Sequence, residues 1–245
     1  MKRDLDFTAA WNDAVAMMKQ HQSLVLPIAG LFIFLPGAIF AVMMPPPEID
    51  AAMDPGAQLA MLTGFLSAMA PWLFVMSILG MVGNLAIYHL VLGNGRPTVG
   101  EALGLAMGSF LTLFLAGLMS TIAITLGLIL LIIPGVYLAI KFSLIGPAIA
   151  GEGIKSPIEA LSRSWNLTKG NSLRIFGFFL IIGIVGGALY LVASLVAGGL
   201  LGLISATLAS VVDTVFSTIL SVVFLFVVIA VYKQMAASDV SNPIR

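Results

Sequence analysis

The chain alternates between long apolar runs and short polar segments, and the apolar runs have the length needed to cross a membrane. A helix that crosses the hydrocarbon layer needs about 20 consecutive, mostly apolar residues. Six segments fit this requirement, near residues 24–44, 72–93, 108–132, 135–151, 173–196 and 209–232. The pattern therefore predicts an all-α, polytopic membrane protein with six transmembrane helices, forming a single integral membrane domain over residues 1–245.

The third and fourth predicted spans are nearly continuous. The apolar run from Ala102 to Ala150 is too long for one crossing and has the length of a tight helical hairpin. Pro134 and Gly135 are the expected turn, because both residue types interrupt helices. A turn a few residues earlier also fits the pattern.

Two polar segments have the periodicity of helices that lie on a membrane surface. Near residues 157–169, Ile158, Leu161 and Trp165 form one apolar stripe. Near residues 5–20, aromatic and aliphatic residues recur with the same spacing. Because such helices place rings toward the lipid and charges toward water, both segments are predicted to be interfacial amphipathic helices.

The beginnings of the polar segments indicate an internal repeat. Thr98 and Ser156 are each followed three positions later by a glutamate, Glu101 and Glu159, which is the pattern of a helix capping box. Thr8 begins the N-terminal helix in a similar way, as its expected N-cap. Since two spans follow each of these starts, the pattern predicts three parallel helix-plus-hairpin units related by an axis along the membrane normal. The alternative is that any helix start on this side of the membrane looks the same.

Composition agrees with the membrane assignment. The chain is 60% hydrophobic and 9% charged, whereas soluble domains are about 25% charged, so too little polar surface exists to cover a soluble core. The formal net charge is zero, which gives no reason to expect a nucleic-acid partner. The absence of cysteine excludes disulfides and zinc–thiolate sites.

Charge is distributed asymmetrically across the predicted topology. The segments on one side carry all but one of the basic residues, namely Lys2, Arg3, Lys19, Arg96, Lys155, Arg163, Lys169, Arg174, Lys233 and Arg245. The loops on the other side carry Glu48, Asp50, Asp54 and Asp213. Because cytoplasmic loops carry an excess of Lys and Arg, both termini are predicted to be cytoplasmic.

The middle of the chain resembles a known membrane family. The resemblance rests on PGVYLAIKFSL from Pro134, on Glu152-Gly153, and on EALSRSWNLTKGN ending at Asn171. These residues resemble the membrane domain of bacterial glycerophosphoryl diester phosphodiesterases and the stand-alone membrane proteins related to it. In the two-part enzymes a separate soluble barrel is catalytic, and no extramembrane segment here is long enough for one. The resemblance therefore implies a multi-pass protein of the bacterial inner (plasma) membrane, without phosphodiesterase activity.

Lys141 is the remaining basic residue, and it lies within a predicted span. Ionisable residues inside a membrane are costly and are often functional. Lys141 is therefore a candidate for a polar cavity, a lipid phosphate contact or a substrate path, with Tyr137 one turn away. The alternative is that its ammonium group snorkels or bonds a backbone carbonyl. The other candidate contacts for a lipid headgroup or a partner protein are Arg163, Trp165, Lys169 and Arg174.

Small residues recur at helical spacing in several spans. The sixth span carries a predicted helix-packing stripe of Ser210, Thr214, Ser217 and Ser221, with a pore lining as the alternative. Three glycine pairs at a spacing of four also predict close helix packing: Gly104 and Gly108, Gly183 and Gly187, and Gly198 and Gly202. Asn84 and His89 form a weak polar pair in the second span. Two histidines without a carboxylate cluster predict no metal site.

These features favour a non-enzymatic membrane protein that interacts with membrane lipids, including anionic headgroups, or with a partner membrane protein or second copy of itself. The alternative is a small transporter or lipid-handling protein with Lys141 in a polar path. An intramembrane enzyme is the least favoured hypothesis, because no nucleophile–base pair or phosphate-binding loop is present in the sequence. No cofactor, metal or nucleic acid is expected.

We expect the C-terminus to lie in the cytoplasm, because the basic segments, including the one that ends at Arg245, share one side of the predicted topology. Two fusions after Arg245 measure this: a fluorescent protein that folds in the cytoplasm and an alkaline phosphatase that is active only outside it. Fluorescence without phosphatase activity is the expected outcome, and strong phosphatase activity would overturn the topology.

Overall fold

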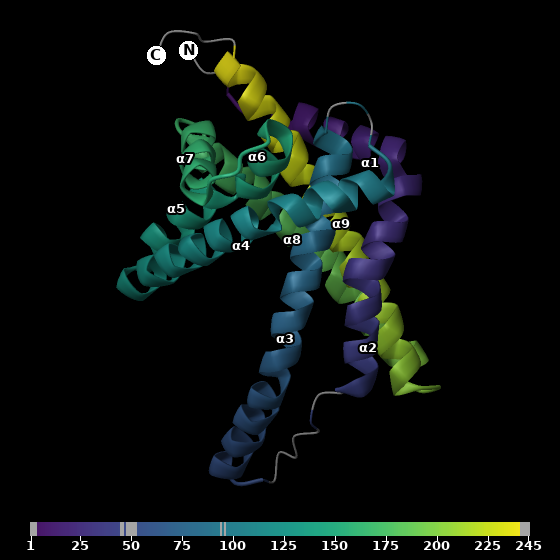
Figure 1. Cartoon of the computed structure of the whole chain (residues 1–245). Coiled ribbons are helices and arrows are strands. Elements are labelled where there is room, and N and C mark those ends of the chain that lie inside the picture. Colours follow the sequence, from purple (N-terminus) through teal and green to yellow (C-terminus); the bar gives the residue numbers. More distant parts are fainter. Residues whose placement is uncertain (1–3, 45–46, 48–52, 94, 96, 241–245) are drawn as a thin grey trace.

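The helices meet in one packed region and separate toward the opposite end of the molecule (Figure 1). The computed structural model describes residues 4–44, 47, 53–93, 95 and 97–240. Within these residues the regular elements are helical: α1 (Phe7–Ala29), η1 (Gly30–Phe34), α2 (Leu35–Met43), α3 (Pro55–Leu92), α4 (Val99–Leu130), α5 (Ile132–Phe142), α6 (Ile145–Glu152), α7 (Pro157–Thr168), α8 (Ser172–Val196), η2 (Ala197–Leu201) and α9 (Ala206–Val240).

Six helical segments are long and apolar enough to cross a membrane: Phe7–Met43, Pro55–Leu92, Val99–Leu130, Ile132–Glu152, Ser172–Leu201 and Ala206–Asp239. The predicted all-α, polytopic architecture is therefore confirmed.

The packed region lies where α1 begins, α7 crosses and α9 ends, which we call the basic end because the segments around it carry Lys155, Arg163, Lys169, Arg174 and Lys233. Two backbone–side-chain hydrogen bonds between Asp6 and Gln234, both of 3.2 Å, join the two ends of the chain there. Of the charged residues that set the predicted sidedness, Lys2, Arg3, Glu48, Asp50, Arg96 and Arg245 lie outside the described residues.

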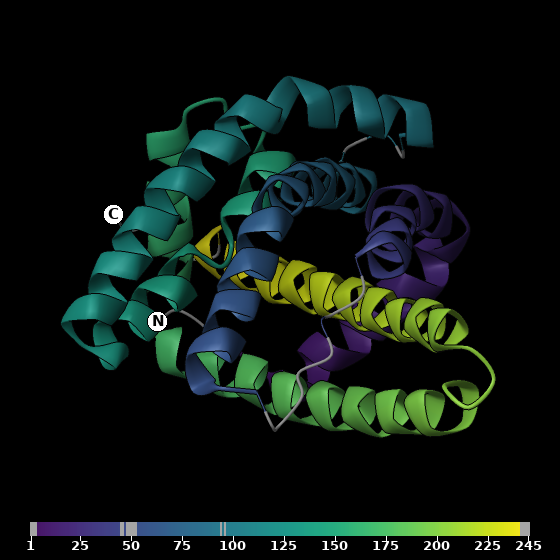
Figure 2. The ribbon, with the colours of Figure 1, turned by 90° about the horizontal axis from the view of Figure 1, so that it is seen from below.

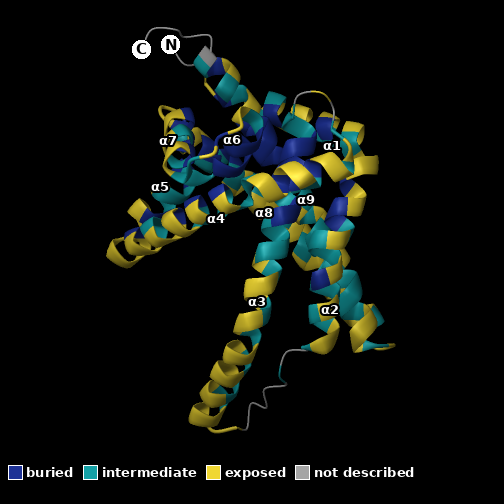
Figure 3. Cartoon of the chain, viewed as in Figure 1, coloured by how far each residue is buried: buried dark blue, intermediate teal, exposed yellow. Residues whose placement is uncertain are grey.

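Burial is concentrated at the basic end (Figure 3). Residues 145–150 of α6 and 225–232 of α9 are buried throughout, together with most of residues 82–90 of α3. At the tip of the α4–α5 hairpin, residues 128–133 are 45% to 82% exposed although all are leucine or isoleucine. Lipid tails are as apolar as leucine, so these side chains need no protein partner in a membrane. Figures 1 and 2 show α8 beside α9 along the splayed half of the molecule.

The first span is one long helix, so the predicted separate interfacial helix near residues 5–20 is wrong. α1 continues through residues 20–24 without a break, since that stretch contains neither glycine nor proline. Its N-cap is Asp6, whose carboxylate accepts from the Ala9 N–H at 3.0 Å, and not the predicted Thr8. The polar first turns of α1 pack against the other helices, because Ala10, Ala14 and Met17 are buried in the core.

The α4–α5 hairpin turns at Leu131, which is extended with φ −161°, and not at Pro134 and Gly135. Pro134 lies in the first turn of α5, where a helix does not need the missing N–H. Gly135 instead allows close packing, because a Cβ there would lie 2.7 Å from the Leu128 backbone nitrogen of α4. The earlier turn that the sequence also allowed is the one observed.

The predicted fourth span is broken into α5 and α6, which are joined at Ser143 and Leu144. After it, α7 agrees with the interfacial helix predicted near residues 157–169. Thr98 and Glu101 form the complete capping box, whereas Ser156 contributes only its acceptor half, to the Glu159 N–H.

Only the third predicted unit has a separate polar helix, since α1 and α4 run directly into their spans. That part of the predicted repeat is wrong, and the repeat as a whole stays a prediction.

The predicted glycine pairs do not make the helix contacts expected of them. A Cβ built on Gly104, Gly108, Gly183, Gly187 or Gly198 meets nothing within 4 Å, and one on Gly202 meets its own helix. The close approaches between helices occur instead at Gly83, Gly127, Gly135, Gly146 and Gly151. Spacing alone does not identify a contacting face, because many of the 25 glycines fall at this interval by chance.

We expect Gly135→Ala to destabilise the protein by about 1–3 kcal/mol, because the added methyl group overlaps the α4 backbone. Thermal unfolding in detergent, followed by intrinsic fluorescence, measures the change as a lower Tm. Gly104→Ala is the matched control on α4, since a methyl group added at Gly104 meets nothing within 4 Å. The Tm of this variant should stay unchanged or rise slightly. Equal losses in the two variants would contradict the proposed role of Gly135.

Candidate functional site

The break between α5 and α6 is closed by one serine from α7. The Ser164 hydroxyl donates to the Lys141 carbonyl at 2.7 Å and accepts from the Leu144 N–H at 3.2 Å. Ser164 is fully buried. Irregular backbone at membrane depth is tolerated only where other groups satisfy its hydrogen bonds, and Ser164 meets this requirement on both sides of the break.

The same break positions Lys141, which is 2% exposed. Its Nζ lies 5.3 Å from the centroid of the Tyr137 ring and 5.0 Å from that of Trp165. Tyr137 is one turn earlier on α5, and Trp165 follows Ser164 on α7, so the contacts that close the break also bring the second ring to the ammonium group. The two rings meet edge to face with centroids 6.0 Å apart. We call Lys141, Tyr137 and Trp165 the lysine cage, because both rings attract the cation.

A second cation stands near the cage. Lys169 follows the last residue of α7 and lies close enough to Lys141 for their charges to repel. Gly170, with φ +87°, then reverses the chain into α8. Asn171 precedes α8 but does not cap it, because its side-chain oxygen accepts from the Leu5 N–H at 3.2 Å. The first N–H groups of α8 therefore have no side-chain cap, next to two lysines.

An apolar groove of about 600 Å³ begins beside these residues and runs between α5 and α8. Its lining residues are Ile132, Ile133, Val136, Tyr137, Ile140, Gly170, Ser172, Leu173 and Phe176. The polar members Tyr137, Gly170 and Ser172 adjoin the lysine cage and the start of α8, while Ile132 and Ile133 lie at the start of α5. We call this feature the α5–α8 groove; its lining residues are uncharged, and two of them adjoin a lysine, since Tyr137 belongs to the lysine cage and Gly170 follows Lys169.

Arg163 lies in a different cluster, which ties α6, α7 and α9 together. Its Nε donates to both carboxylate oxygens of Glu152, at 2.7 and 2.9 Å, and its Nη1 donates to Asp239 at 2.5 Å. The Tyr232 hydroxyl donates to Glu152 at 3.1 Å. The hydrogen bond with Glu152 is the main cause that raises the pKa of the Arg163 guanidinium above its ordinary value, so the charge persists across the physiological pH range. Arg163 thus has a structural role in this cluster, and its predicted contact with a lipid or partner stays a prediction.

Arg174 is paired more loosely, with Asp4 at 2.9 Å. The two side chains are 51% and 64% exposed, so water screens the pair and its contribution to stability is small. Of the six predicted binding residues, the structure therefore brings Lys141, Tyr137, Trp165 and Lys169 together and places the two arginines elsewhere.

The hydroxyl stripe of α9 is satisfied within its own helix. Ser210, Thr214, Ser217 and Ser221 donate to carbonyls three or four residues earlier, at 2.8 to 3.0 Å. The predicted interhelical hydrogen bonds are not formed by these hydroxyls in the described part of the chain. Thr214 does pack closely on α2, where a Cβ at Gly37 would lie 3.0 Å from its methyl group.

The remaining polar residues of the second span separate. His89 is buried with its Nε2 3.2 Å from the Ser109 hydroxyl of α4, while Asn84 lines two cavities. Among the residues that the structure describes, no group of three histidine, aspartate or glutamate side chains is arranged to hold a metal ion.

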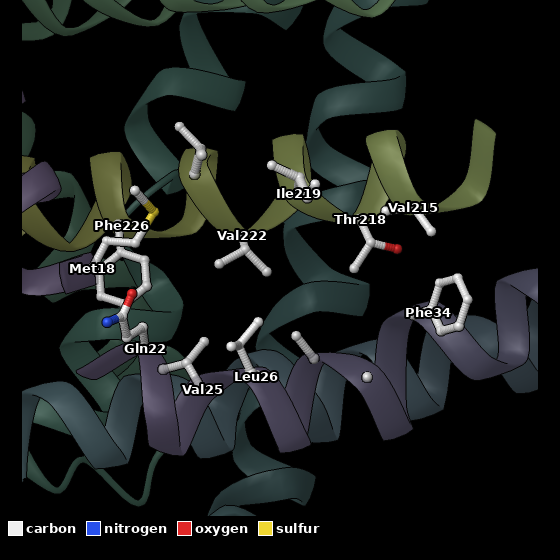
Figure 4. Close-up of a pocket in the computed structure, with 13 residues that line it drawn as sticks. Met18, Gln22, Val25, Leu26, Phe34, Val215, Thr218, Ile219, Val222 and Phe226 are labelled. Atoms are coloured by element: carbon white, nitrogen blue, oxygen red, sulfur yellow. The ribbon is translucent and has the colours of Figure 1, made fainter. Parts of the chain in front are cut away.

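A second groove, of about 490 Å³, lies between α1 and α9, whose side chains face each other across it in Figure 4. Met18, Val25 and Leu26 from α1 oppose Val222 and Phe226 from α9, and Gln22 and Thr218 are its only polar side chains. No charged residue lines it. It can hold an acyl chain, but unlike the α5–α8 groove it contains no residue of the lysine cage.

Sequence reasoning missed the residues that position the site. The sequence predicted no role for Ser164 or Asp239, and Glu152 entered only through the family resemblance, because a hydroxyl or carboxylate on a polar helix has no distinctive spacing. One signal was available for Ser164, since it lies beside Trp165 on a helix expected to rest on the membrane domain.

A family model described as a domain of unknown function, DUF7847, matches residues 59–235, which is more than half of the chain. No curated protein and no solved structure matches the chain. The match leaves the resemblance to the phosphodiesterase membrane domain as a prediction, and it includes the whole of the α5–α8 groove.

We expect Ser164→Ala to lower the free energy of unfolding by about 1–3 kcal/mol, because it leaves the Lys141 carbonyl and the Leu144 N–H without their partner. Hydrogen exchange should increase at residues 141–145 together with a lower Tm. Ser162→Ala is the control, since Ser162 is exposed on the same helix. Unchanged exchange at the break would show that Ser164 does not hold it.

Proposed function

The chain belongs to the family described as a domain of unknown function, DUF7847, and we propose that it is a non-enzymatic integral membrane protein that binds anionic phospholipids. The observation that carries this proposal is that two lysines from different elements adjoin residues that line the α5–α8 groove: Lys141 lies against the Tyr137 ring, and Lys169 precedes Gly170. The headgroup phosphate would lie between the lysine cage and the start of α8, and an acyl chain would follow the groove.

The electrostatics at this end favour an anion. Two like charges held near each other repel, and a phosphate between them converts that repulsion into attraction. Each lysine near a membrane surface contributes about 1 kcal/mol to the attraction of anionic lipids. The start of α8 adds backbone N–H groups and the positive end of the helix dipole, which bind phosphate in many proteins. Since Arg163 already serves Glu152 and Asp239, the lysines are the cations left for a ligand at this position.

The geometry supports binding more than passage. Lys141 is almost fully enclosed by α5 and α7, with its ammonium group against two aromatic rings. A residue on a transport path would face an open route on both sides. An enclosed cation next to an apolar groove is better suited to retaining an amphipathic molecule. The transporter hypothesis is therefore the second candidate.

Orientation and location are part of the same proposal. The basic end lies on the cytoplasmic side of a bacterial inner membrane, as the positive-inside rule predicts, and the headgroup comes from the cytoplasmic leaflet. Anionic lipids in that leaflet and basic residues at this end of the protein are complementary.

We expect Lys169→Gln to weaken phosphatidylglycerol binding about fivefold, because it removes roughly 1 kcal/mol of attraction without disturbing a buried group. Lys141→Gln should do the same and retain the fold if the glutamine keeps contact with the two rings. The measurement is a phosphatidylglycerol titration of the delipidated protein in detergent, read by native mass spectrometry.

Lys155→Gln is the control, since Lys155 is an exposed lysine at the same end that adjoins no residue of the groove, whereas Lys169 directly precedes Gly170. If Lys155→Gln weakens binding as much as Lys169→Gln, the attraction is general and the specific site is disproved. Phosphatidylcholine should bind the wild type and the Lys169→Gln variant equally, because this lipid carries no net charge.

A further inference from the structure

Asn84 is a polar residue inside the membrane domain, on α3. It lies eight residues before the end of α3 at Leu92, about 12 Å along the helix axis. Within the described part of the chain, its carboxamide makes no hydrogen bond to another residue. The residue is partly buried and lines two cavities, so a ligand there can make the hydrogen bonds that the protein does not. Polar residues inside transmembrane helices often mark functional sites.

Two cavities meet at this residue. One, of about 690 Å³, lies between α3, α5, α8 and α9, and the other, of about 240 Å³, lies between α3, α4 and α6. Asn84 and Tyr88, one turn apart on α3, line both. Tyr88 is fixed by Gly146 of α6, where an added Cβ would lie 2.5 Å from its ring. We call the larger space the α3 cavity.

The chemistry of the lining restricts the ligand. Besides Asn84 and Tyr88, the polar residues of the α3 cavity are Ser143 and Ser221, whose hydroxyl protons are already donated to the carbonyls of Ile140 and Ser217. No charged side chain lines either cavity, so an ionic headgroup would find no counter-charge. The Asn84 amide offers both N–H donors and a carbonyl acceptor, and the other walls are apolar.

We propose that the α3 cavity binds an uncharged lipid through its carbonyl or hydroxyl group, with Asn84 as the residue that recognises it. The Asn84 amide donates to a ligand carbonyl, or accepts from a ligand hydroxyl, and the hydrocarbon of the ligand lies against Phe176, Phe179 and Leu180 of α8. The volume is within the range of about 300–1,000 Å³ that ligand sites usually have. The α3 cavity shares Val136, Ile140 and Phe176 with the α5–α8 groove but is not lined by Tyr137 or Gly170. The proposal does not rest on the phospholipid proposal.

Mass spectrometry of lipids that stay with the protein purified in mild detergent tests the proposal. We expect an uncharged lipid with a carbonyl or hydroxyl group to be enriched over its share of the membrane extract, and to fall at least fivefold in Asn84→Leu. Ser77→Leu is the matched control, because Ser77 is an exposed polar residue two turns away on α3, and it should retain the lipid. Equal amounts in wild type and Asn84→Leu, or no enriched uncharged lipid in the wild type, would overturn the proposal.

A second variant keeps the test decisive if Asn84→Leu does not fold. Ser221→Phe fills the same cavity from α9, and it should also reduce the bound uncharged lipid while phosphatidylglycerol binding is unchanged. A diacylglycerol with a diazirine on its acyl chain, in phosphatidylcholine vesicles, should label peptides of α3 and α8 in the wild type, and less so in Ser221→Phe. Labelling spread evenly over all exposed helices and unaffected by Ser221→Phe would contradict a defined site.

Discussion

The two hydrogen bonds of Ser164 are the interaction on which the candidate site depends. Without them, the interruption between α5 and α6 would leave a carbonyl and an N–H group unpaired in an apolar environment, and a continuous helix would be favoured. Because Ser164 pairs with the backbone groups on both sides of the interruption, α6 can turn into the core and α7 lies against the end of α5. That arrangement places the Trp165 ring over Lys141. The basic residues then have different surroundings: Arg163 joins three helices, Lys141 is enclosed beside two rings, and Lys169 is exposed next to the groove residue Gly170.

Close packing at glycine residues holds the rest of the core together. Helices approach most closely where glycine faces a large side chain, as at Gly146 against Tyr88 and Gly151 against Tyr232. These contacts lie at the basic end, where loops and interfacial residues supply hydrogen bonds. Toward the other end the helices are covered by lipid, and van der Waals packing between them gives little advantage over packing with acyl chains.

Sequence patterns predicted what depends on composition and length: the all-α class, six spans, the helix at 157–169 and the intramembrane position of Lys141. They failed where tertiary contacts decide. Pro134 suggested a turn, but proline is also favoured in the first turn of a helix, and the chain reverses at Leu131. Arg163 was predicted only as a contact for a lipid or a partner, because its pairing with Glu152 and Asp239 depends on how the fold brings α6 and α9 to α7. The lysine cage was half predicted, through Tyr137 one turn from Lys141, while the approach of Trp165 depended on a broken helix that no sequence period reveals.

The uneven distribution of packing gives the molecule a stiff end and a compliant end. Bilayers differ in thickness, and a spanning helix adapts by tilting, at a cost of fractions of a kcal/mol per ångström. In a bundle packed along its whole length, such tilting would disturb every interior contact. Here the free halves of α3, α4 and α8 can change their angles while the core between α1, α6 and α9 stays intact. The architecture therefore tolerates membranes of different thickness without transmitting the difference to the end that holds the lysines.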